Sequence, residues 1–130
     1  MARFTILMYH QVCVPESEAE AKYACPPARF ARHMRYLKRC HPVVSLTAVR
    51  RHLGGDGGLP DGAVAVTFDD GFRNNYTDAL PTLRRYRIPA TLFLTAGLVG
   101  ETNRWMAGRD FPERPMVTWD EVREMAGAGV

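Results

Sequence analysis

Two adjacent carboxylates, Asp69 and Asp70, directly follow a segment, 63–68, that is apolar throughout. Such a segment predicts a strand buried on both faces, and two carboxylates at its end repel each other. A divalent metal would relieve this repulsion, because one carboxylate can ligate the ion while the other stays free to accept a proton. Gly71 permits a positive φ, so the chain can turn sharply and present both carboxylates at the strand end.

The same residues also fit a plain turn that ends the strand, because Asp and Gly are common turn residues. The spacing alone leaves these two interpretations open. It does exclude a D-x-D phosphotransfer motif, because no residue separates the two carboxylates.

Alternating apolar and amphipathic segments predict an α/β fold with parallel strands and crossover helices, either doubly wound or part of a barrel. We expect strands at 4–9, 43–44, 63–68 and 90–94, with loops at 12–24, 54–62 and about 97–115. We expect helices from Pro27 to just before Pro42, from Ser45 or Thr47 to Leu53, from Thr77 or Asp78 to about Tyr86, and after a capping box at Thr118–Glu121. The first helix is expected to carry one apolar face, with Phe30, Met34, Leu37 and Cys40, and the last helix another, with Val122, Met125 and Ala126.

In such folds, ligands bind beyond the carboxyl ends of the strands. His10 follows the first strand, Gly71 follows the Asp pair, and Thr95 follows the last strand. We therefore expect His10, Gly71 and Thr95 to lie at the rim of one site with Asp69 and Asp70. The alternative for His10 is a structural hydrogen bond at the end of its strand.

The composition fits one globular domain, with 130 residues of which 46% are hydrophobic and 24% charged. No apolar run approaches the roughly 20 residues of a membrane helix, and residues 1–10 do not resemble a signal peptide. The cysteines, Cys13, Cys25 and Cys40, form no C-x-x-C pair, so we expect neither a disulfide framework nor a zinc ribbon.

The net charge is +3, and the segment from Arg29 to Arg51 carries basic residues but no acidic one. Arg29, Arg32, Arg35 and Arg39 recur at helical spacing and predict one basic stripe. Such a stripe is usually a solvated helix face, and the alternative is a surface for an anionic partner. Because no nucleic-acid motif accompanies it, we expect no specific nucleic-acid binding.

The Asp pair lies within a longer series of segments: Leu7–His10, Thr67–Phe72, Asn74–Tyr76, Ala79–Leu83, Ile88–Leu94 and Val117–Val122. In this order, the series resembles the polysaccharide deacetylase family (carbohydrate esterase family 4, the NodB homology domain). The resemblance covers nearly the whole chain and is far more specific than the Asp pair alone.

This resemblance implies a distorted (β/α) barrel and a metal-dependent hydrolase that removes N-acetyl or O-acetyl groups from a polysaccharide or related carbohydrate. In the family's T-F-D-D-G motif the first Asp is the catalytic base and the second is a metal ligand, roles that fall on Asp69 and Asp70. The implied cofactor is a divalent metal, zinc in the first instance, which would polarise the acetyl carbonyl and lower the pKa of its bound water.

The family's second motif, H-[ST]-x-x-H, supplies two further metal ligands and does not occur in this sequence. The later motifs, which supply an arginine, an acidic residue and a general-acid histidine, are absent as well. We therefore expect residues 1–130 to be a single, C-terminally truncated deacetylase domain, an incomplete barrel. By itself this chain is expected to bind the catalytic metal poorly and to turn over little substrate, since a catalytic zinc needs about three protein ligands.

The expected partner is a carbohydrate polymer or oligosaccharide. The alternative function is a non-catalytic remnant that binds a glycan or a partner protein. A third hypothesis is binding of nucleic acid through the basic segment Arg29–Arg51, with a steep salt dependence.

Overall fold

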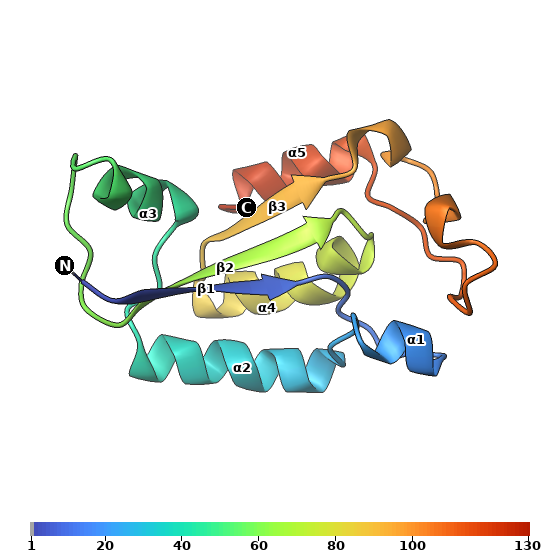
Figure 1. Ribbon diagram of the computed structural model, residues 1–130, viewed down its shortest axis with the longest axis horizontal. Helices are drawn as coiled ribbons and strands as arrows, with labels where there is room; N and C mark the ends of the chain where they lie inside the picture. Colours follow the sequence, from blue (N-terminus) through green and yellow to red (C-terminus); the bar gives the residue numbers. More distant parts are fainter. Residues whose placement is uncertain (1) are drawn as a thin grey trace.

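The computed structural model describes residues 2–130. Within them, the chain forms one sheet of three parallel strands. The strands β1 (Phe4–Tyr9), β2 (Ala63–Asp70) and β3 (Ala90–Leu94) lie in the order β1-β2-β3. Their carboxyl ends meet at one end of the sheet, beyond which lie α1 (Glu18–Ala21) and the segment that follows β3 (Figure 1). The predicted α/β fold with parallel strands is confirmed.

The central strand β2 is buried along its first six residues, as its continuous apolar sequence predicted. It is paired on both sides, with Tyr9 opposite Phe68 on β1 and Leu94 opposite Asp70 on β3. Pairing with β3 carries the strand two residues further than predicted, so Asp69 and Asp70 are its last residues rather than a following turn.

The core lies between the sheet and two helices, α2 (Pro27–Cys40) and α4 (Leu80–Tyr86). On α2 the predicted apolar face is buried at Phe30, Met34 and Leu37, whereas Cys40, at the end of the helix, is exposed. The Phe30 ring packs against Phe68 of β2, with centroids 5.7 Å apart. Each such burial contributes about 1.5–3 kcal/mol, so these contacts fix the helix to the sheet.

The predicted strand at Val43–Val44 is wrong, because this segment forms only a single bridge between Val43 and Val64. Pro42 has no N–H to donate, and α3 (Leu46–Leu53) begins too soon for a strand to extend. Ser45 rather than Thr47 caps α3, accepting a hydrogen bond from the Ala48 N–H. The sheet therefore has three strands instead of four.

Other boundaries differ because local hydrogen bonds outweigh the sequence pattern. The predicted loop 12–24 contains α1, which Ser17 caps. The helix expected to start at Thr77 or Asp78 begins earlier, as the π-helical turn η1 (Asn75–Ala79) that leads into α4. The predicted loop 97–115 contains short 3-10 turns, η2 (Ala96–Leu98) and η3 (Arg104–Met106).

The last helix, α5 (Trp119–Gly127), begins at the predicted capping box. Thr118 Oγ1 accepts a hydrogen bond from the Glu121 N–H, and the Glu121 carboxylate accepts one from the Thr118 N–H. Met125 is buried against Leu80 and Val117, but Ala126, which was predicted on the same apolar face, is exposed. None of the helices within residues 2–130 is long and apolar enough to cross a membrane.

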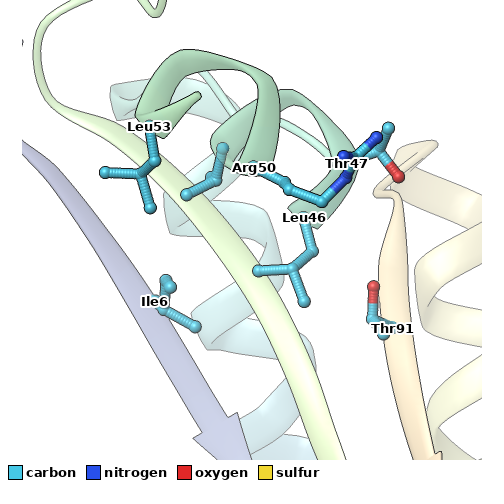
Figure 2. A pocket seen from close by; sticks show the side chains of 7 residues that line it. Ile6, Leu46, Thr47, Arg50, Leu53 and Thr91 are labelled. Atoms are coloured by element: carbon cyan, nitrogen blue, oxygen red, sulfur yellow. The ribbon is translucent and has the colours of Figure 1, made fainter. Parts of the chain in front are cut away.

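The opposite face of the sheet is largely open. Met8 of β1 is 62% exposed and Phe93 of β3 is 51% exposed, and only Ala90 of β3 is buried. A groove of about 380 Å³ lies between this face and α3, where Ile6 and Thr91 of the sheet face Leu46 and Leu53 (Figure 2). Ile6 pairs with Ala65, four residues before Asp69, which places the groove roughly 13 Å along the strand from the Asp pair.

A buried ion pair joins α1 to the segment after β3. Glu20 is 0% exposed, and its carboxylate accepts hydrogen bonds from Arg114 Nε at 2.9 Å and from Arg114 Nη2 at 2.7 Å. Gln11 and the Glu16 N–H donate to the same carboxylate. Burial raises the pKa of Glu20, but the hydrogen bonds and charge of Arg114 outweigh it and hold this pKa below its usual range.

Replacing Arg114, whose side chain is 19% exposed, should destabilise the fold, because its partner Glu20 is fully buried. Arg114→Met leaves the Glu20 carboxylate buried without its partner, and we expect a loss of about 3–5 kcal/mol in the free energy of unfolding at pH 7. Because the pKa of Glu20 is depressed in the native protein, the pair's stabilisation is present above about pH 4.3 and is lost as the pH falls. The difference between the native protein and the variant should therefore shrink in acid, as urea unfolding at several pH values would show.

The matched control is Arg123→Met, which removes an exposed ion pair with Asp120. An exposed pair of this kind contributes about 0–1 kcal/mol. Equal losses in the two variants would contradict the role of the buried pair.

Candidate functional site

The carboxyl ends of β1 and β2 bring His10 next to Asp69. The His10 Nε2 atom lies 3.8 Å from Asp69 Oδ2, and both side chains are mostly buried. The two residues are far apart in sequence, and the parallel pairing of Tyr9 with Phe68 is what places them side by side. The structure thus places His10 at the predicted rim, one strand from the Asp pair.

The backbone at Asp70 and Gly71 turns sharply, as the sequence predicted, but through two residues instead of one. Both have positive φ angles, 80° at Asp70 and 85° at Gly71. A positive φ is a strained conformation for Asp, and such strain persists only where the surrounding structure holds the chain. Those bonds are donated by Thr95 N to Asp70 O, at 3.1 Å, and by Val117 N to Gly71 O, at 2.9 Å.

Thr95 therefore also lies at the predicted rim, directly after β3, where it precedes η2. Its backbone N–H is committed to Asp70. The residues that the sequence predicted for the rim, His10, Gly71 and Thr95, thus lie around the end of β2, the strand that carries both carboxylates. Their roles in a reaction stay predictions.

Electrostatics at the Asp pair favour a nearby cation. Burial raises the pKa of Asp70, His10 opposes this rise, and the neighbouring Asp69 carboxylate adds to it. A positive charge at Asp70 would favour its ionised form. Within residues 2–130, however, no group of three or more His, Cys, Asp or Glu side chains lies close enough to hold a metal ion. Asp70 suits one position in a metal's ligand set, and the described residues do not supply the rest.

Sequence reasoning missed the groups that hold His10 in place. Asn75, which is 0% exposed, donates from Nδ2 to the His10 carbonyl at 2.9 Å. The ring of Tyr23 packs edge-on against the His10 ring, with centroids 5.4 Å apart. Asn75 lies shortly after the Asp-Gly turn, in the segment Asn74–Tyr76 of the family resemblance, but neither signal indicates that its side chain reaches β1.

The comparison with known families decides the family of the chain. The sequence profile described as polysaccharide deacetylase matches residues 56–130, which include β2, the Asp pair and β3. This chain belongs to the polysaccharide deacetylase family. The resemblance inferred from the sequence segments is therefore confirmed.

Individual relatives agree with this family. The chain is 31% identical over 109 residues to a poly-beta-1,6-N-acetyl-D-glucosamine N-deacetylase of Staphylococcus aureus, covering 83% of this chain and 35% of that protein. The structure of IcaB from Ammonifex degensii matches with a TM-score of 0.81 and 32% identity, over 97% of this chain and 49% of that one. A de-N-acetylase from Aggregatibacter actinomycetemcomitans matches with a TM-score of 0.78 and 28% identity, over 97% of this chain and 51% of that one.

The three-stranded structure of this polysaccharide deacetylase chain thus corresponds to about half of the solved relatives. It spans a still smaller share of the Staphylococcus aureus protein. The matched range includes the T-F-D-D-G strand end, and the roles of Asp69 and Asp70 stay predictions from the family resemblance.

A methyl group at Gly71 should disturb the turn that carries the Asp pair. In Gly71→Ala the new Cβ would lie 3.0 Å from Leu94 Cδ2, at a φ of 85° that alanine rarely adopts. We expect a loss of about 1–3 kcal/mol in the free energy of unfolding, measured by urea denaturation.

The control is Gly97→Ala, because a Cβ at Gly97 meets no atom within 4 Å. This change should stay within about 0.5 kcal/mol of the native value. A loss of the same size in both variants would argue against strain at the Asp70–Gly71 turn.

Proposed function

We propose that this chain supplies the catalytic carboxylate, Asp69, and one metal ligand, Asp70, of an enzyme that hydrolyses acetyl groups on a polysaccharide. The observation that carries the proposal is the geometry at the end of β2. There, two adjacent carboxylates of the family's T-F-D-D-G motif end the strand, the second of them at a φ of 80°, and His10 lies 3.8 Å from the first.

The substrate proposed is a polymer of N-acetylated glucosamine, and the bond that is hydrolysed is the amide C–N bond of its N-acetyl group. The support comes from the relatives, since the Staphylococcus aureus protein is named for its action on poly-beta-1,6-N-acetyl-D-glucosamine. A second relative is named a de-N-acetylase. An amide substrate also fits a site in which a carboxylate can accept a proton from water.

In this proposal Asp69 is the general base. It accepts a proton from the water whose oxygen attacks the acetyl carbonyl carbon, and the C–N bond then breaks to give acetate and the free amine, which takes up a proton. His10 lies beside the Asp69 carboxylate, with its Nε2 atom 3.8 Å from Oδ2. A divalent metal, zinc in the first instance, would supply an electrophile for the acetyl group, with Asp70 as one of its ligands.

The proposal is tested by acetate release from an N-acetylglucosamine polymer, using the protein expressed from its complete native gene. Asp69→Asn removes the proton acceptor, and we expect kcat to fall by about 10²–10⁴ while bound metal, measured by elemental analysis, is retained. Asp70→Ala removes a ligand, so bound metal and acetate release should both be lost.

Asp56→Asn, in the exposed loop after α3, is the matched control and should keep both properties. Acetate release that survives Asp69→Asn would refute the assignment of the base. A native protein that binds the glycan without metal and releases no acetate would favour the alternative of a non-catalytic remnant.

A further inference from the structure

The segment that carries His10 is held in place by side chains rather than by the sheet. The β1–β2 ladder ends at the pair Tyr9 and Phe68, one residue before His10. Beyond it, Gln11 bridges Ala24 on one side, through hydrogen bonds with the backbone of Tyr23 and Cys25. On the side toward β2, Gln11 has no partner in the β1–β2 ladder, which pairs only residues 4–9 of β1.

Two consecutive asparagines take the place of that missing ladder. Asn75 Nδ2 donates to the His10 carbonyl at 2.9 Å, and Asn74 Oδ1 accepts from the Val12 N–H at 3.0 Å. Asn74 Nδ2 also donates to Gln11 Oε1 at 3.0 Å. An amide side chain carries both a donor and an acceptor, so this pair can bond backbone groups as a neighbouring strand would.

The π-helical turn η1 begins at this pair, with Asn74 as its first flanking residue. In this turn the Leu80 N–H donates to the Asn75 carbonyl, five residues earlier. At its start, the side chains of two successive residues, Asn74 and Asn75, both form hydrogen bonds with the segment 10–12. Single π turns inside helices are rare and occur frequently at functional sites. The turn also lies only a few residues after Gly71, so the chain that carries the Asp pair returns to fix the strand end that carries His10.

Asn75 also keeps a polar atom that the fold does not use. Its side chain is fully buried, yet Oδ1 has no hydrogen-bond partner among residues 2–130. A buried acceptor without a partner costs stability. A buried side chain with an unpaired acceptor adds little to the stability of the core. The hydrogen bond that Asn75 Nδ2 donates to the His10 carbonyl is therefore the interaction to which we assign a role.

We propose that Asn75 is a positioning residue, which holds the His10 backbone so that the imidazole stays beside the Asp69 carboxylate. This inference rests on the proposed function, because it assigns Asn75 an effect on the step in which Asp69 accepts a proton. Asn75 acts through His10 and does not itself touch the substrate.

The test is a double-mutant cycle on acetate release by the protein from its complete native gene. Asn75→Ala should lower kcat by about tenfold or more, with KM within about twofold of the native value. In the His10→Ala background, Asn75→Ala should cause no further loss, because the two residues act in one chain of contacts. Equal losses in both backgrounds would overturn the proposal, since a general structural role does not depend on His10.

Ser45→Ala is the control for stability. Ser45 Oγ accepts a hydrogen bond from the Ala48 N–H at 3.1 Å and caps α3, so this variant also loses a bond between a polar side chain and the backbone, away from the Asp pair. It should melt at a lower temperature and keep kcat within about twofold. If Ser45→Ala lowers kcat as much as Asn75→Ala does, the loss reflects stability and the proposal fails.

A second measurement does not depend on activity. Amide hydrogen exchange at Gln11 and Val12 should become at least tenfold faster in Asn75→Ala and stay unchanged in Ser45→Ala. Unchanged exchange in Asn75→Ala would overturn the positioning role even in an active enzyme. If the native protein releases no acetate, the proposed function fails, and faster exchange would still show that Asn75 holds the His10 segment.

Discussion

The register of the buried central strand is the constraint on which the rest of this structure depends. β2 is shielded on both faces for six residues and paired on both edges, so it cannot slide without exposing apolar side chains. A slip of one residue would turn every side chain to the opposite face and would exchange which carboxylate stands beside His10. The hydrophobic effect along Ala63–Phe68 thereby fixes the positions of Asp69 and Asp70, although neither residue is apolar.

Those parts of the fold that arise from local pattern followed directly from the sequence. The apolar runs of β1, β2 and β3, the α2 face built on Phe30 and Met34, and the capping box at Thr118 all depend on residues close together in the chain. The predicted strand at Val43–Val44 failed because a short apolar pair forms a strand only if a neighbour supplies hydrogen bonds, and here one bridge is all that forms. The sequence of η1 likewise carries no periodicity that distinguishes a π turn from an α-helix.

In the site, too, features set by neighbouring residues could be predicted, whereas features set by contacts between distant elements could not. Asp69, Asp70, Gly71 and the rim position of His10 could be predicted, since strand ends in a parallel sheet share one edge. The positive φ of Asp70 could not, because it is imposed by bonds from Thr95 and Val117, which approach from other elements. The asparagine pair and the Glu20–Arg114 ion pair were missed for the same reason, and Glu20 looked like an ordinary charge in an acidic loop.

The ion pair between Glu20 and Arg114 also has a consequence for the order of folding. Its two residues are 94 positions apart, and β2, β3 and the segment after them lie between the two in the chain. Forming a contact between residues so far apart costs the conformational entropy of closing a long loop, so such contacts tend to form late in folding. The rim around the Asp pair is therefore expected to close after the sheet is built, and this pair should govern how slowly the finished protein unfolds rather than how fast it folds.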